Sequence, residues 1–109
     1  MGEDEVAWRY LHETLDESFA IGALPIALDA LVGVAGLRAK AGQCAPAAEL
    51  LGLVQSHPAT KEESQQIAEP VLAILRDKLP ADQLEAALTR GKALELEAVI
   101  AEILAEREN

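Results

Sequence analysis

The chain has 109 residues, which is enough for one hydrophobic core, and we expect a single helical domain over 1–109. Half of the residues are hydrophobic but only 3% are aromatic, and a composition dominated by Ala, Leu, Val and Ile favours helices over strands. The formal net charge of −10 argues against binding to nucleic acid or to an anionic membrane surface, and the single cysteine, Cys44, excludes an internal disulfide.

The first predicted helix spans residues 4–20. Its large apolar residues recur at spacings of three and four and therefore share one face. They are Trp8, Leu11, Leu15 and Phe19. Acidic residues at the start of this helix favour the positive end of its dipole, and they stand where a signal peptide would carry basic residues. Together with the single cysteine, this leads us to expect a cytoplasmic protein.

The second predicted helix, residues 25–41, is apolar around most of its circumference, so we expect other helices to cover it on more than one side. Gly42 can adopt the left-handed conformation that ends a helix. The third predicted helix, residues 45–56, has Pro46 in its first turn, and His57-Pro58 follows its end.

Three further helices are predicted over residues 60–79, 81–90 and 94–106. The pattern Thr60-Lys61-Glu62-Glu63 is typical of a capping box at the start of the first of them. Gly91 is expected to end the second. Connections throughout are short, so successive helices should pack as antiparallel neighbours.

The helix over 60–79 carries an apolar set that we expect to face the core. This set is Ile67, Val71, Ile74 and Leu75. Pro70 lies within the same helix and removes one backbone hydrogen bond, so a kink or local irregularity is expected there.

One stretch resembles a tetratricopeptide repeat, an αα-hairpin motif. The residues that carry the packing of this hairpin are Leu31, Val34, Ala35, Gly42, Ala47, Leu51 and Pro58. The resemblance implies a hairpin over 25–58 in which the small side chains of Ala35 and Ala47 let two helices cross closely. The chain departs from the family pattern at the aromatic positions, which hold Leu31, Arg38 and Leu51, and in a final proline that comes one residue early.

A longer part of the chain, over 50–64 and 72–106, is similar to the C-terminal ends of large bacterial signalling regulators. These are STAND-type ATPases and LuxR-type or cyclase-linked regulators. The matching segments are Leu50-Leu51-Gly52, His57-Pro58-Ala59, Leu79-Pro80, Ala86-Ala87 and the stretch 90–94. The resemblance implies a tetratricopeptide-like superhelix of about six antiparallel helices that senses an inducer or a partner.

In this reading, residues 4–20 are the second helix of a partial repeat, 25–58 form the best repeat, and 60–107 form a degenerate repeat with a C-terminal cap. The first helix, which carries Trp8, Tyr10 and Phe19, would then receive a preceding repeat. The chain has no G-x-x-x-x-G-K-[ST] phosphate loop and no recognisable basic DNA-reading helix. We therefore expect it to be the tail of a larger regulator.

The expected function is that of a non-catalytic protein-interaction or sensing module, with a protein, a peptide or a neighbouring domain of the same chain as its partner. The residues predicted to line a partner groove are Asp29, Val32, Gly36, Arg38, Ala39 and Lys40. The alternative is a free-standing helical homo-oligomerisation domain, in which apolar faces meet their own copies.

We expect no catalytic residue, cofactor or metal site. Cys44 and His57 fall at opposite ends of one predicted helix, about 20 Å apart at a rise of 1.5 Å per residue, which is too far for a nucleophile and its base. His12 has Asp16 four residues later, and such a pair is more typical of a solvated helix face than of a metal site.

Overall fold

The structure, a computed structural model, describes residues 2–106 of the chain. Within this part it has six α-helices and no strand. The helices are α1 (Gly2–Ala20), α2 (Leu24–Lys40), α3 (Cys44–Ser56), α4 (Glu62–Lys78), α5 (Ala81–Lys92) and α6 (Leu96–Ala105). Every end lies within two residues of the predicted one, so the all-α fold with about six helices is confirmed. Residue 107 of the predicted segment 60–107 lies outside the described residues.

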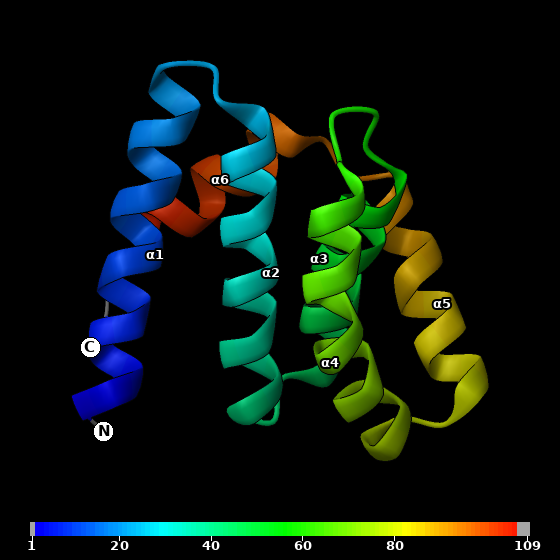
Figure 1. The fold of residues 1–109 in the computed structure, drawn as a ribbon. Coiled ribbons are helices and arrows are strands. Elements are labelled where there is room, and N and C mark those ends of the chain that lie inside the picture. Colours follow the sequence, from blue (N-terminus) through cyan, green and yellow to red (C-terminus); the bar gives the residue numbers. More distant parts are fainter. Residues whose placement is uncertain (1, 107–109) are drawn as a thin grey trace.

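The helices stand in two rows (Figure 1). α1, α2 and α4 are side by side in front, α3 and α5 stand behind, and α6 crosses behind α1 and α2. α2 packs on α1, α3 and α4, while the most extensive contact between two helices joins α3 to α5. α2 and α4 run in the same direction, as do α3 and α5.

The core lies around α2 and α3, which bury more residues than any of the other described helices. Leu31, Val34, Ala35, Ala47 and Leu51, which the repeat resemblance places at the packed positions of the hairpin, each have 0% exposed surface. The turn between the two helices has Gly42 at a φ of +87°, a left-handed conformation that a glycine adopts without steric cost. Pro58 is exposed and follows the end of α3.

Two glycines bring α3 and α5 together at the level of their backbones. A Cβ atom at Gly52 would lie 2.1 Å from the carbonyl oxygen of Leu88, and one at Gly91 would lie 2.0 Å from the carbonyl oxygen of Glu49. No side chain fits at either position without separating the helices. The prediction that Gly91 ends α5 is therefore wrong, because Gly91 is buried inside the helix and α5 continues to Lys92.

The start of α4 also differs from the prediction. The helix begins at Glu62, and no side-chain hydrogen bond caps it at Lys61. The hydroxyl of Thr60 donates instead to the backbone oxygen of Val54, because the loop turns back onto the end of α3. Pro70 lies inside α4, which is assigned as one helix from Glu62 to Lys78.

The last helix returns to the first. His12 Nε2 lies 3.0 Å from the backbone oxygen of Leu104 in the last turn of α6, although the two residues are 92 positions apart. The ring of Trp8 meets the ring of His12 edge-on, with the ring centroids 6.2 Å apart. The part of α1 that carries Trp8 and His12 thus contacts α6 of the same chain, whereas Tyr10 is 66% exposed.

Candidate functional site

An apolar stripe runs along the outer side of α4. Ile67 and Ile74 are 46% and 39% exposed, and the prediction that both face the core is wrong. Pro70 is exposed and Val71 is half-buried between them. These four residues follow the spacing i, i+3, i+4, i+7 and therefore share one side of the helix. The core side of α4 is instead made by Ser64, Ala68, Leu72 and Leu75.

α2 supplies the surface next to this stripe. A Cβ atom at Gly36 would lie 3.7 Å from Val71 Cγ2, an ordinary contact distance, so the two helices are neighbours with room between them. Ile26 is 51% exposed in the first turn of α2, and Gly33 and Leu37 are half-buried farther along it. We call the surface formed by Ile26, Asp29, Gly33, Gly36 and Leu37 of α2 and Ile67, Pro70, Val71 and Ile74 of α4 the α2–α4 face.

α1 borders this face on its other side. A Cβ atom at Gly33 would lie 2.7 Å from Leu11 Cδ2, so α1 comes close to α2 at this point. The side chain of Leu11 fills the space beside Gly33, whereas a Cβ atom at Gly36 would have only Val71 within 4 Å.

One carboxylate lies within this otherwise apolar face. Asp29 Oδ1 accepts a hydrogen bond from the hydroxyl of Ser64, which is 2% exposed in α4. The bond ties α4 to α2 and holds the half-buried carboxylate in place. Asp29 Oδ2 has no hydrogen-bond partner among residues 2–106. A cationic group of a partner can approach this oxygen from the face.

The six residues predicted to line a groove do not come together. Asp29 and Gly36 lie on the α2–α4 face. Val32 and Ala39 are 3% and 0% exposed, so their side chains belong to the core and are closed to a partner. The two basic residues, Arg38 and Lys40, form the ion pairs described next.

Both of these ion pairs tie the last turn of α2 to other helices. Arg38 donates to Glu106, just beyond α6, at 2.8 Å, and Lys40 donates to Asp4 in α1 at 3.0 Å. The two ion pairs thus join the end of α2 to Asp4, near the start of α1, and to Glu106, which follows α6. The cations expected in the groove instead hold α1 and α6 to α2.

The groups considered for chemistry remain apart. Cys44 is the first residue of α3 and His57 follows its last turn, where His57 Nδ1 accepts a hydrogen bond from the backbone of Ala59 at 3.0 Å. His12 faces α6 rather than Asp16. No group of three or more His, Cys, Asp or Glu side chains that could hold a metal ion occurs within residues 2–106.

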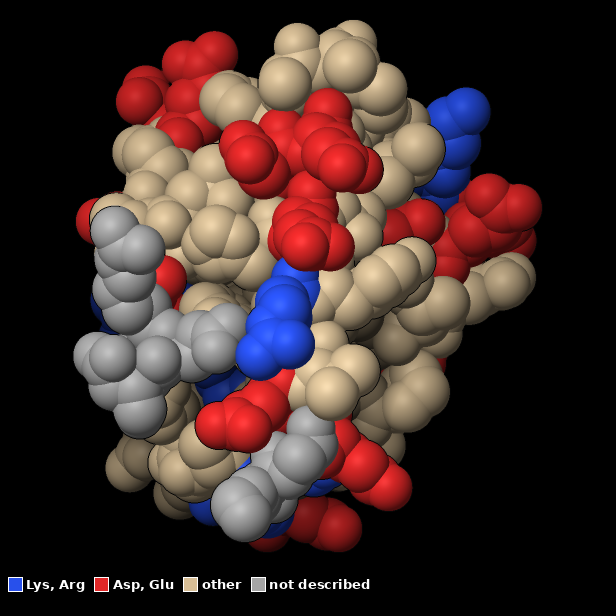
Figure 2. Space-filling view, turned by 90° about the vertical axis from the view of Figure 1, so that its left-hand side faces the viewer, with Lys and Arg blue, Asp and Glu red and all other residues tan. Residues whose placement is uncertain are grey.

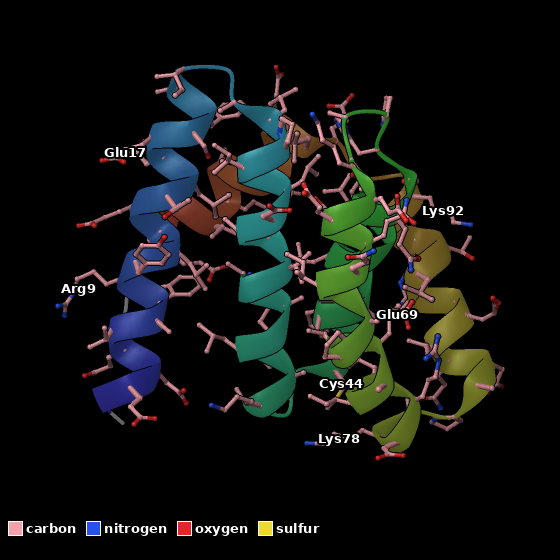
Figure 3. All side chains as sticks on the ribbon, in the orientation of Figure 1. Arg9, Glu17, Cys44, Glu69, Lys78 and Lys92 are labelled. Carbon is pink, nitrogen blue, oxygen red and sulfur yellow. The ribbon has the colours of Figure 1, made fainter. Side chains whose placement is uncertain are left out.

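The molecule's outer side along α1 is more acidic than the α2–α4 face. Figure 2 shows acidic side chains gathered over the upper part of this side, with a basic side chain below them. α1 contributes exposed Glu13, Asp16 and Glu17, and the side chains of Arg9 and Glu17 project away from the other helices (Figure 3). Solvation of this side accounts for these charges.

Comparison with known proteins gives no match for this chain. No family model matches it, and neither a curated protein nor a solved structure does. In the described part, no helix has the length and apolar character needed to cross a membrane. The candidate site therefore depends on the geometry and chemistry of the α2–α4 face.

Proposed function

We propose that this chain is a non-catalytic protein-interaction or sensing module that receives its partner on the α2–α4 face. The observation that carries the proposal is the exposure of Ile67 and Ile74 beside α2, in a chain whose net charge is −10. Grouped exposed apolar residues on a soluble domain mark interaction surfaces more often than scattered ones do.

A partner segment lying along α4 would cover both isoleucines. Because Ile67 and Ile74 are 46% and 39% exposed, covering the rest of one of them stabilises a complex by about 0.6–1.4 kcal/mol, before the cost of ordering the partner. A basic side chain in that segment could pair with Asp29, the carboxylate within the face. The partner that best fits is an amphipathic protein segment with apolar residues on either side of a Lys or Arg.

The sequence resemblance supports a more specific proposal. Its tetratricopeptide-like hairpin over 25–58 and its similarity to the ends of bacterial signalling and transcriptional regulators favour a C-terminal sensing segment of such a regulator. An immunoblot of the source cells tests this part. A polypeptide much larger than the 11.6 kDa of this chain supports the proposal, and one of similar size contradicts it.

The binding surface is tested by photo-cross-linking in the source cells. A photoreactive amino acid at position 67 or 74 should give the same cross-linked protein, and one at the exposed position 102 of α6 should not. With the photoreactive residue at position 70, the otherwise unaltered chain should give the same product, and the variant I67S/I74S should lose it. Its free energy of unfolding should fall by about 1–3 kcal/mol, because the two isoleucines are 46% and 39% exposed and lose the contacts of their buried parts. Equal products from positions 67, 74 and 102 would contradict the proposal.

A further inference from the structure

The edge formed by α4 and α5 carries a groove of its own, away from the α2–α4 face. Its volume is about 420 Å³. Its apolar lining includes Leu72, Leu79, Leu84 and Leu88, and two of its charged residues are Arg76 of α4 and Glu85 of α5. Both charged side chains are exposed. We call this surface the α4–α5 edge.

This edge is the open end of the two rows of helices. At the other end, α6 packs on α1, whereas no described helix follows α4 and α5. α4 and α5 make little direct contact with each other, because α4 packs mainly on α2 and α3, and α5 packs on α3. Leu79 and Leu88 are left half-buried between them. The terminal helices of stacked arrays usually present polar surfaces, and these leucines depart from that pattern.

The charges at the edge are arranged to complement a second copy of the same surface. Arg76 lies two residues before the end of α4, and Glu85 lies four residues after the start of α5. Residues 79–80 join these two helix ends, and at a rise of 1.5 Å per residue Arg76 and Glu85 lie about 3 Å and about 6 Å along the helices from them. Both residues line the groove, so one rim carries a positive and the other a negative charge near the same end.

We propose that two copies of this chain associate through the α4–α5 edge about a two-fold axis parallel to the helices. This rotation places α4 of each copy on α5 of the other, so Arg76 of each copy meets Glu85 of the other copy, and the half-buried Leu79 and Leu88 of the two grooves face each other. A two-fold interface needs a surface that complements itself, which opposite charges near the same end of the two rims of an apolar groove provide. The proposal is independent of partner binding on the α2–α4 face.

The existing ion pair of Arg76 does not prevent this contact. Arg76 lies 3.9 Å from Glu69, and both side chains are more than half exposed. Figure 3 shows Glu69 on the side of α4 toward α5. A long, solvated pair of this kind holds its partners weakly, so the guanidinium can turn to the second copy.

Charge-reversal variants test the proposal by sedimentation equilibrium. The unaltered chain should show a monomer–dimer equilibrium with a dissociation constant below about 1 mM. Arg76→Glu and Glu85→Arg should each raise the dimer dissociation constant by about tenfold or more, because each change places like charges together twice in the dimer. An equimolar mixture of the two variants should associate again, since each heterodimer contact then joins Glu to Arg.

The controls carry the same charge changes away from the edge. Lys61→Glu and Glu13→Arg, both at exposed positions, should leave the dissociation constant within about threefold of that of the unaltered chain. A strictly monomeric chain up to about 1 mM would overturn the proposal. Association that the single reversals do not weaken, or that the mixture does not restore, would overturn it as well.

Discussion

The two helix pairs that run in the same direction, α3 with α5 and α2 with α4, differ in how closely their backbones approach. Between α3 and α5, Gly52 and Gly91 each face a carbonyl oxygen at a distance that admits no Cβ atom. Between α2 and α4, Gly36 has room for a Cβ atom, and the hydrogen bond of Ser64 to Asp29 joins the helices. Direct backbone packing fixes the back of the molecule, while the looser front pair leaves apolar side chains on the surface.

The largest effect is expected at the tight pair. Gly91→Ala or Gly52→Ala should lower the free energy of unfolding by about 3 kcal/mol or more, because the new methyl group meets rigid backbone rather than a movable side chain. Urea unfolding followed by circular dichroism measures the change. A loss below about 1 kcal/mol in both variants would mean that α3 and α5 do not approach through these glycines.

The next effect is expected where α2 crosses α3. Ala35→Leu or Ala47→Leu should cost about 1–3 kcal/mol, because both alanines have 0% exposed surface and the added atoms overfill the hairpin. The melting temperature is the measurement, with Ala73→Leu as the control at an exposed position of α4. An unchanged melting temperature in either variant would contradict the close crossing that the repeat resemblance implies.

A smaller effect is expected at the bond between the front helices. Asp29→Ala should cost about 1 kcal/mol, since it leaves the buried hydroxyl of Ser64 without this acceptor. A double-mutant cycle with Ser64→Ala isolates the interaction, and its coupling energy should be about 0.5–1.5 kcal/mol. A coupling energy near zero would show that the bond does not hold α4 to α2 in solution.

The smallest effect should have the opposite sign. Gly36→Ala should stabilise the protein by about 0.5–1 kcal/mol, because alanine is the better helix former and its methyl group only touches Val71. Thermal unfolding of Gly36→Ala and Gly91→Ala compares the same substitution at the loosely packed pair α2–α4 and at the tightly packed pair α3–α5. Destabilisation by Gly36→Ala would mean that α2 and α4 are as closely packed as α3 and α5.

Much of the fold could be predicted because its signals are local. Gly42 and the prolines at helix starts mark helix boundaries through their own backbone preferences. The spacing of apolar residues indicates that the segments between these boundaries are helical. The role of Gly91 could not be predicted this way. A glycine near a helix end is compatible with a turn and with a close crossing, and only the position of α3 decides between them.

The candidate site was harder to predict for a related reason. The apolar residues of α4 cover a wider arc than its neighbours bury, and the sequence does not say which part of the arc remains exposed. Ile67 and Ile74 were therefore assigned to the core, although Ser64 takes a buried position instead. On α2, the predicted groove included Val32 and Ala39 because sequence spacing alone cannot distinguish a side covered by other helices from an open one.

The return of α6 to α1 has a consequence for the order of folding. Helices α2 to α5 can pack on one another as they are synthesised, since their contacts join segments that are close in sequence. The contact between His12 and Leu104 spans 92 residues and cannot form until α6 has been made. Until then α6 does not cover His12, whose ring meets the ring of Trp8. We therefore expect the closure of α6 onto α1 to be the last of these contacts to form during synthesis, and the fluorescence of Trp8, whose ring meets that of His12, tests this.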